Sequence, residues 1–250
     1  MKPLVARMNG VGRNFAQLGQ ARLPWLVALV LLSIQAWVES RGGYLAVPWW
    51  YETFGLTRED FLHGKLWQVA TYAFLHGSWL HAMANVGCLL MLGTRIEHFL
   101  GSGTLLKILG IGVLGGAVGH LTLAAGGENA GPLVGSSAAC FSLLILITTL
   151  SPESRMWPLP VSARNLGLGL LLSFAALALM DPALGVPGIS GAGEWMSRQG
   201  LSSWWSIGHA CHLGGGLAGW VYGRWLLRPR VTLDRLRRDR ARREAGGKLG

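Results

Sequence analysis

Six apolar segments, each close to the length needed to cross a lipid bilayer, dominate the sequence. A hydrocarbon core of roughly 30 Å requires about 20 helical residues. Because lipid offers no hydrogen bonds to the backbone, single segments that span it must be helical. The sequence therefore predicts an all-α polytopic membrane protein with six transmembrane helices. The predicted spans cover about 23–38, 79–98, 104–125, 136–150, 165–184 and 204–227.

The composition agrees with a membrane protein and argues against nucleic-acid binding. Only 14% of the 250 residues are charged, whereas globular domains have roughly 25%. The formal net charge is +10, but ten of the 22 Lys and Arg residues lie between Arg224 and Lys248. Aromatic residues that would stack on bases are scarce there. A basic tail after an apolar helix fits a topology signal or a contact with anionic lipid, so we expect the bilayer and no nucleic acid as a partner.

The distribution of basic residues predicts the orientation. With the N-terminus inside, the inner segments hold 18 of the 22 Lys and Arg residues. The outer loops hold the other four, at Arg41, Arg58, Lys65 and Arg198. Positive residues concentrate on the cytoplasmic side of membranes. We therefore expect a cytoplasmic segment over 1–22, a membrane domain over 23–227 and a basic cytoplasmic tail over 228–250, in the inner membrane of a bacterium.

The first apolar segment allows two readings, a cleaved secretory signal peptide and an uncleaved anchor. A signal peptide ends in a small-x-small cleavage site. The sequence after Val38 contains no convincing site of this kind, so the uncleaved anchor is preferred.

The cysteines and the close histidine pair do not predict a cofactor. Cys88, Cys140 and Cys211 all fall inside apolar runs, and an odd number at such depth gives neither a disulfide framework nor a metal knuckle. They are interpreted as packing residues. The grouping "HACH" at 209–212 lacks a matching set of ligands elsewhere, so no metal and no other cofactor is expected.

Glycines spaced four apart recur in the third and sixth segments. They are Gly112 with Gly116, Gly115 with Gly119, and the series Gly215, Gly219 and Gly223. Small residues at this spacing let helix backbones approach closely in lipid, so these two helices are predicted to pack tightly.

Two long segments lie between the predicted spans on the outer side. Residues 39–78 contain "VPWWYETFG", which suits an interfacial belt, and the Gly/Ser-rich residues 185–203 predict a mobile loop.

Polar side chains at membrane depth gather in one layer. Such residues are costly in lipid and are functional candidates by default. The set is His81 and Asn85 in the second segment, His120 in the third, Ser136 and Ser137 in the fourth, and His209 and His212 in the sixth. With the predicted orientation, His81, Asn85 and the serines lie toward the outer face. His212 lies about eight residues in, or roughly 12 Å along the axis.

The fourth segment is unusually short, and it opens with the two serines. About 15 residues reach only roughly 22 Å, so its N-terminus should start below the outer surface and the preceding "AAGGENAGPLVG" should dip inward. A submerged helix start exposes unpaired amides and the positive end of the dipole. Either serine is therefore a nucleophile candidate beside anion-stabilising donors. The alternative is an N-cap and a small packing residue.

A nucleophilic serine needs a base, and histidines are the candidates at this depth. His212 serves as the base or as a satisfied core histidine, whereas His209, one turn nearer the surface, is expected to be solvated at a cavity rim. His81 and Asn85 are four apart and share a helix face. They either donate to an oxyanion or bridge helices.

Taken together, these motifs resemble the rhomboid intramembrane serine proteases from about Gly64 to Gly223. "GKLWQVATYAFLHGSWLHAMAN" is similar to the stretch that leads into the family's second helix with its H-x-x-x-N. "GTRIEHFLGS" resembles the following G-x-x-x-E-x-x-x-G signature. "GSSA" falls at the family's G-x-S-G, and "HLGGGLAG" resembles its last-helix motif. The resemblance implies a six-helix rhomboid-like bundle with a short, partly submerged fourth helix.

The resemblance also implies roles for individual residues. The nucleophile is Ser137 rather than Ser136, the base is His212, and the oxyanion donors are His81 and Asn85 with the Ser137 amide. Phe141 falls where the family often packs an aromatic ring on the base. Two positions depart from the pattern: Ala138 replaces a glycine, and Gln68 replaces a common arginine.

The implied activity is that of a serine endopeptidase that uses a Ser–His dyad on single-span membrane proteins. Substrates would enter laterally past the fifth helix and be cut at a small residue on the extracytoplasmic side. The alternative is an inactive rhomboid-like protein that binds client helices. A transporter would need polar groups through the whole membrane thickness, which the single layer disfavours. The sequence selects no physiological substrate and no oligomeric state.

Overall fold

Helices are the main secondary structure of the residues that the structure describes, and three of them are apolar enough to span a membrane. The computed structural model describes residues 21–123, 131–155, 160–229, 237–238 and 240, and within these ranges there is no extended strand. The three apolar helices are α2 (Leu23–Ser40), α8 (Ser102–Leu123) and α10 (Ala163–Met180). The predicted cytoplasmic segments, 1–22 and 228–250, lie almost wholly outside the described residues.

The other three predicted spans also coincide with helical segments. The second is continuous, with α6 (Trp79–Cys88) and α7 (Thr94–Leu100) joined by a π-helical turn over Leu89–Gly93. The fourth is α9 (Ser137–Leu150), as short as predicted at 14 residues. The sixth is α12 (His209–Leu226). A count of six membrane crossings stays a prediction, because only the three helices named above meet the length and apolarity of a span by themselves.

The start of the last helix was predicted five residues too early. Residues Ser202–Ser206 form a 3₁₀ turn instead of the first turn of the span. The Ser206 hydroxyl donates to the Ser203 carbonyl, and Trp205 Nε1 donates to Ser197 Oγ. These local bonds compete with helix formation. As a result, His212 lies in the first turn of α12 rather than about eight residues into a helix.

Residues 185–203 are largely helical, which corrects the prediction of an irregular loop. They contain α11 (Ser190–Met196) and a further turn over Ser197–Leu201. The Ser190 hydroxyl donates to the Asp181 carbonyl and accepts from the Val186 amide. Gly193 lies so close to the Met180 carbonyl that no side chain would fit. The small and hydroxylated residues of this segment therefore make tight turns and close contacts.

The segment between α2 and α6 is folded around one buried amide side chain. It contains three short helices and a 3₁₀ turn, namely α3 (Pro48–Phe54), α4 (Arg58–Leu62), α5 (Gln68–Thr71) and Tyr72–Phe74. Gln68 is fully buried. Its Nε2 donates to the carbonyls of Glu52 and Thr53 and to the Asp60 carboxylate, and its Oε1 accepts from the Thr57 amide. Gln68 thus anchors this segment, at the position where the family commonly has an arginine.

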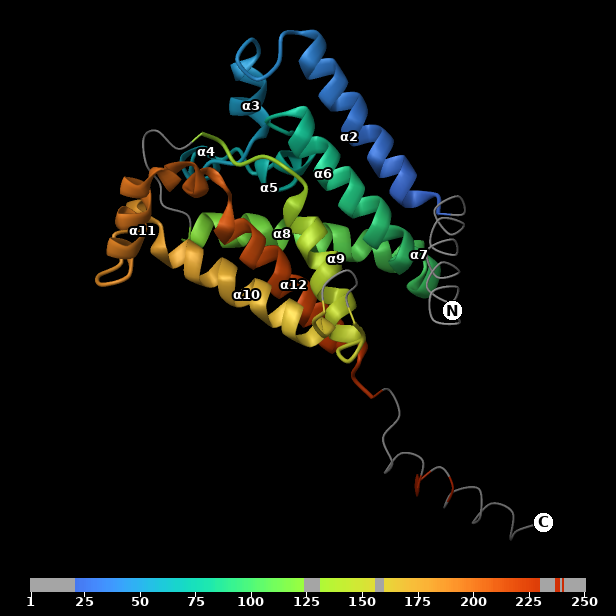
Figure 1. Ribbon diagram of the computed structural model, residues 1–250. Helices are drawn as coiled ribbons and strands as arrows, with labels where there is room; N and C mark the ends of the chain where they lie inside the picture. The colour runs from blue at the N-terminus through green and yellow to red at the C-terminus, as the bar shows by residue number, and fades with distance from the viewer. Residues whose placement is uncertain (1–20, 124–130, 156–159, 230–236, 239, 241–250) are drawn as a thin grey trace, which may run out of the picture.

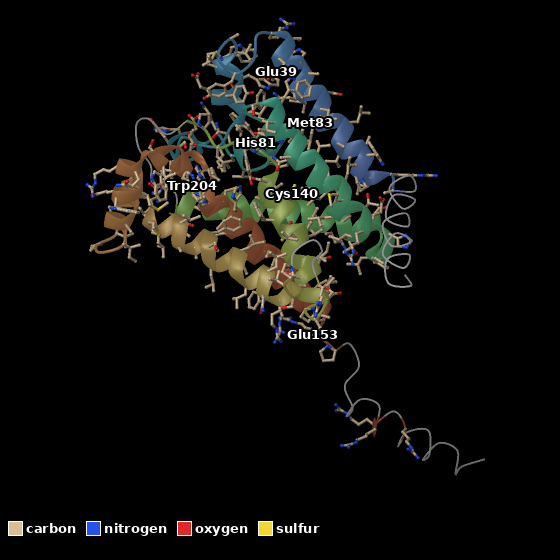
Figure 2. The ribbon with its side chains drawn as sticks, viewed as in Figure 1. Glu39, His81, Met83, Cys140, Glu153 and Trp204 are labelled. Carbon is tan, nitrogen blue, oxygen red and sulfur yellow. The ribbon has the colours of Figure 1, made fainter. Side chains whose placement is uncertain are left out.

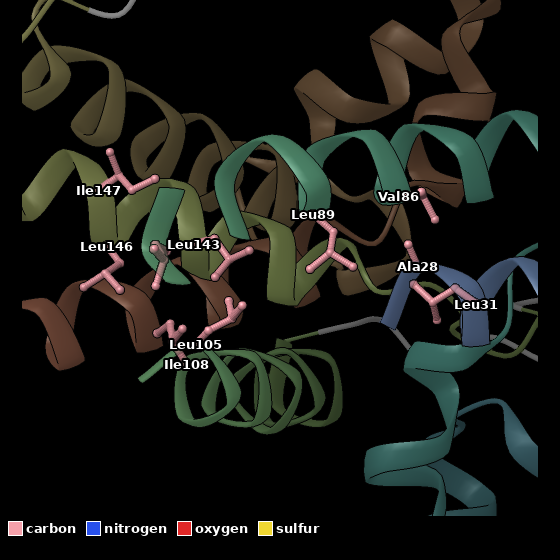
Figure 3. Packing of buried hydrophobic residues seen from close by; sticks show 10 residues of the cluster. Ala28, Leu31, Val86, Leu89, Leu105, Ile108, Leu143, Leu146 and Ile147 are labelled. Carbon is pink, nitrogen blue, oxygen red and sulfur yellow. The ribbon is translucent and has the colours of Figure 1, made fainter. Parts of the chain in front are cut away.

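The centre of the molecule is a tight contact of α8, α9 and α12, with α2 and α10 on opposite sides (Figure 1). Glycines make this contact possible, as the spacing predicted. Gly112 of α8 lies against Ser142 of α9, and Gly219 of α12 lies against the carbonyl of the same serine. A Cβ at either glycine would overlap those atoms. Farther from the site, leucines and isoleucines of α8 and α9 pack with Leu89 and with Leu31 of α2 (Figure 3).

Candidate active site

Two side chains from different helices meet at the N-terminal ends of α9 and α12. Ser137 is the first residue of α9, and its Oγ lies 2.7 Å from Nε2 of His212. The His212 amide donates to the Gly208 carbonyl, which fixes the first turn of α12. One turn further on, Gly215 allows the Ala138 carbonyl to pack directly against α12. We call Ser137 and His212 the candidate dyad.

A glycine turn delivers the chain to Ser137. Gly135 has a φ of +115°, a conformation that side chains rarely allow. A Cβ there would lie 2.6 Å from Cε1 of His81, so the ring of His81 rests on the Gly135 backbone. The Gly135 amide donates to the Tyr72 carbonyl over 2.9 Å. The backbone that leads to the serine is therefore held by Tyr72, in the 3₁₀ turn before α6, and by His81 of α6.

The neighbouring hydroxyl points elsewhere. Ser136 occupies the N-cap position of α9, but its side chain makes no capping hydrogen bond. Its Oγ lies 3.4 Å from Nε2 of His76, whose ring is 5.0 Å from that of His81. Only Ser137 of the two serines contacts His212. His76 was not singled out from the sequence, although its position five residues before His81 was a signal that could have found it.

Two aromatic rings enclose the imidazole of His212. The ring centroid of Phe141 lies 4.7 Å from that of His212, where the resemblance placed it. Phe174 of α10 lies 5.2 Å away and also contacts Phe141. Nothing in the sequence had marked Phe174, because a phenylalanine in an apolar helix is ordinary. His212 Nδ1 is buried and has no hydrogen-bond partner in the described part of the chain, so the two rings and the Nε2 contact with Ser137 orient the imidazole.

His209 lies at the cavity, as expected, but it is less solvated than expected. Its side chain is 7% exposed, and its Nε2 lies 2.9 Å from the Trp204 carbonyl in the 3₁₀ turn before α12. The residue is in the lining of the cavity described below. The His209 ring lies 6.5 Å from that of His212.

Unpaired donors face the region next to Ser137. Asn85 is buried, and its Nδ2 has no acceptor among the described residues. A Cβ added to Gly135 would lie 3.5 Å from Asn85 Nδ2 and 2.7 Å from His81 Nε2. The first amides of α9 have no acceptor within their own helix. An amide, an imidazole and backbone N–H groups thus lie around one turn of chain.

A cavity of about 790 Å³ opens beside the dyad, and three histidines are in its lining: His81, His120 and His209. Its other walls include residues 131–134, 177–178 and 205–208. Ser137 and His212 are not part of this lining, but His81 and His209 each neighbour them. Figure 2 places His81 and Trp204 toward one end of the bundle and Glu153 at the opposite end. The cavity therefore offers open space next to His81 and His209, the two lining residues that neighbour the dyad.

The two departures from the family pattern are accommodated in the packing. The methyl group of Ala138 is fully buried against Gly116 of α8, a glycine whose own Cβ would overlap it. Gln68 replaces the common arginine with the hydrogen bonds described above.

In the same segment, the hydrogen bond from Lys65 holds the pKa of Asp60 below its usual value, with further hydrogen bonds from Gln68 and Thr57. Burial, reinforced by Glu39, raises the pKa of Tyr51 to about 12.

The described residues offer no metal centre. They contain no group of three or more His, Cys, Asp or Glu side chains placed to hold an ion. The buried Cys140 donates its thiol to the Asn85 carbonyl over 3.4 Å, and Cys211 lies 3.7 Å from the Tyr72 hydroxyl. Both cysteines are packing residues, as expected.

Comparison with known proteins assigns the family. A model of the rhomboid domain matches residues 63–229, well over half of the chain. The chain is also 34% identical over 102 residues to "RHOMBOID-like protein 5" of Arabidopsis thaliana. That match covers 40% of this chain and 31% of the plant protein, so the similarity extends over about a third of the relative's length. With its apolar helices and this match over the whole site, the chain is an integral membrane protein that belongs to the rhomboid family.

Proposed function

We propose that this protein is an intramembrane serine endopeptidase that hydrolyses peptide bonds in or near the transmembrane segments of single-span membrane proteins. The observation that carries the proposal is the 2.7 Å contact between Ser137 Oγ and His212 Nε2. A nucleophilic serine and its base must lie within hydrogen-bond distance. The two residues come from helices far apart in sequence, and glycine contacts hold those helices together.

The dyad would work by acyl transfer. Ser137 Oγ attacks the scissile carbonyl carbon while its proton moves to His212 Nε2. His212 then gives that proton to the leaving amine as the carbon–nitrogen bond breaks, leaving an ester on Ser137. A water molecule attacks the ester with His212 again as base. Collapse of that intermediate releases the carboxyl product and returns the proton to Ser137.

The unpaired donors near Gly135 would stabilise the negative oxygen of the tetrahedral intermediate. Asn85 Nδ2 is buried without an acceptor, and His81 lies on the same turn of chain. The Ser137 amide, at the start of α9, adds a third donor. Donors fixed in place before reaction need no reorganisation when charge develops, and removing one typically costs about 10²–10³ in kcat.

The substrate would reach the dyad from the lipid, past α10 and residues 185–203. Only Ala163, Gly167 and Ala178 of α10 are buried, which leaves this helix the least embedded of those around the dyad. The proposed site opens on the extracytoplasmic side of a bacterial inner membrane, with both termini in the cytoplasm, and the distribution of basic residues supports this orientation. Preferred substrates would have a small residue at the cut and a helix that unwinds readily.

An activity-based probe tests the proposal directly. The full chain in detergent or proteoliposomes should be labelled by a fluorophosphonate, and it should cleave a model single-span protein. Ser137→Ala should abolish labelling and lower cleavage on the order of 10³-fold or more. Ser136→Ala is the matched control, because Ser136 contacts His76 instead, and it should keep most of the activity. Unchanged cleavage by the Ser137→Ala protein would reject the assignment.

The alternative is a protein that binds client helices without cutting them. Its motivation is Ala138, which stands in place of the family's glycine. The methyl group fits against Gly116 without displacing Ser137 from His212, and this favours the protease. A protein that crosslinks to single-span clients equally well with Ser137 or Ala at that position, and takes up no probe, would support the alternative.

A further inference from the structure

A second cavity of about 570 Å³ lies at the end of the bundle opposite the dyad, where α9 ends, α10 begins and α12 ends (Figure 1). Glu153 marks this end in Figure 2. The walls combine basic and apolar side chains. The lining includes two arginines and four apolar side chains, namely Arg164, Leu168, Leu171, Trp220, Arg224 and Leu227.

The two arginines of this cavity have no partner among the residues that the structure describes. Arg164 lies in the first turn of α10 and Arg224 in the last turn of α12, and both are exposed. Neither side chain makes a hydrogen bond or an ion pair with any described residue. The ion pair found among the described residues joins Lys65 and Asp60, in the segment between α2 and α6. Glu153, on the preceding loop, lies outside the lining and pairs with neither. The cavity therefore carries two uncompensated positive charges.

Most of the remaining wall is apolar, apart from Thr148 and Thr149, and two of its large side chains are exposed. Leu168 is 55% exposed and Trp220 is 46% exposed, on the facing sides of α10 and α12. Gly167 packs against Thr148 of α9, which brings α10 close enough to form the floor. A soluble anion would satisfy the arginines but leave this wall uncovered. A molecule with one anionic group and an acyl chain would cover both.

We infer that this cavity binds an anionic glycerophospholipid, with its phosphate at Arg164 and Arg224 and an acyl chain along Leu168 and Trp220. Arginine is suited to phosphate because its planar guanidinium donates two parallel hydrogen bonds. Basic pockets between membrane helices on the cytoplasmic side are suited to such headgroups. The bound lipid would link the start of α10 to the end of α12.

Lipid binding to the full-length protein tests this inference without any measurement of proteolysis. Native mass spectrometry would compare phosphatidylglycerol with phosphatidylcholine of the same acyl chains. We expect tighter binding of phosphatidylglycerol. In the double variant Arg164→Gln/Arg224→Gln, this binding should weaken about tenfold to thirtyfold, from roughly 1 kcal/mol for each basic residue near a headgroup. Arg164→Lys/Arg224→Lys keeps the charge and should retain much of the preference.

The matched control is Arg41→Gln/Arg198→Gln, which removes two basic residues away from this cavity and should leave binding unchanged. A photoactivatable phosphatidylglycerol should label the peptides that contain Leu168 or Trp220 in the wild-type protein only. Equal binding of the two lipids, or unaltered binding by the double glutamine variant with an unaltered melting temperature, would overturn the inference. Displacement of the lipid by glycerol 3-phosphate alone would also overturn it, because the apolar wall would then contribute nothing.

Discussion

The two sides of the candidate dyad are built differently. On the packed side, formed by α8, α9 and residues 44–78, nine of the 14 residues of α9 are buried. On the open side, formed by α10 and residues 181–206, only three of the 18 residues of α10 are buried. Both sides contact the same imidazole, since Phe141 belongs to α9 and Phe174 to α10. The base therefore lies at the boundary between a dense contact and a sparse one.

This difference separates two requirements of the proposed chemistry. Ser137 and His212 must keep a fixed distance, and tightly packed elements do this best. A substrate helix must reach them, which requires an element that moves at low cost in free energy. Regions with few buried contacts open with small free energies. The sequence meets both needs with residue size, by placing glycines where α8 and α12 meet α9 and larger apolar residues on the lipid-facing surface of α10.

The largest contrast is expected from one substitution made on each side. Gly219→Ala places a methyl group into the Ser142 backbone on the packed side, and such overpacking costs about 1–3 kcal/mol. Gly169→Ala makes the same change in α10, where no atom lies within 4 Å. There the substitution should leave the free energy of unfolding unchanged or raise it by up to about 1 kcal/mol, because alanine has the higher helix propensity. Thermal or denaturant unfolding of the purified proteins measures both.

The control for this pair is built in, because both changes convert a helical glycine to alanine far from Ser137. Equal loss of stability at the two positions would mean that α10 is as tightly packed as α9. Our distinction between the sides would then be wrong.

Substitution of the two rings that contact His212 should give a smaller difference. Aromatic contacts of this kind contribute about 0.5–1.5 kcal/mol. Phe141→Ala should therefore slow fluorophosphonate labelling of Ser137 by about tenfold. Phe174→Ala should slow labelling less, by roughly twofold to threefold, because its helix is weakly embedded. Labelling rates are the proper measurement here, since they report the dyad without requiring a substrate helix to enter.

Phe141→Tyr keeps the ring and should restore most of the rate. If Phe174→Ala proves more damaging than Phe141→Ala, then α10 holds the base more firmly than α9 does, and the open side is not open at His212.

Much of this site was predictable because its signals are local in sequence. Glycine spacing in the third and sixth segments predicted the close helix contacts, and the fourth span, predicted over 136–150, placed both serines in the first turn of a helix. The pairing of Ser137 with His212, and the position of Phe141, came from the family motifs. Spacing alone left Ser136 and Ser137 equivalent. The structure separates them because Gly135 turns one hydroxyl toward His212 and the other toward His76.

Features that depend on particular side-chain contacts in the folded protein were not predictable. Because Trp204 and Trp205 are apolar, the predicted last span began at residue 204. In the structure this stretch is a 3₁₀ turn, in which the Ser206 hydroxyl donates to the Ser203 carbonyl. Phe174 has no signal of its own, since its role arises from which face α10 presents to His212. Gln68 was identified only as a departure from a motif. Its hydrogen bonds to four other residues exist only once the whole 44–78 segment has folded.

The smallest expected effect is a pH dependence confined to the packed side. Lys65 donates to Asp60 over 2.8 Å, and Gln68 donates to the same carboxylate. These bonds favour the ionised form and lower the pKa of Asp60. The stability they add is present above the carboxyl's unfolded pKa, near its usual value of 3.8. It is lost as the pH falls through the lower folded value. Because the pair is partly exposed, water screens it and the change should be modest.

Hydrogen exchange measured between pH 6 and pH 3, and corrected for the intrinsic rate, tests this expectation. Amides of residues 57–71 should lose protection toward the acid end, while those of α9 stay protected. Asp60→Asn removes the charge that titrates, so its exchange in this segment should be faster at pH 6 and should vary less with pH. If the variant retains the wild-type profile, another group governs the segment, and the Gln68 contacts to backbone carbonyls hold it without help from Asp60.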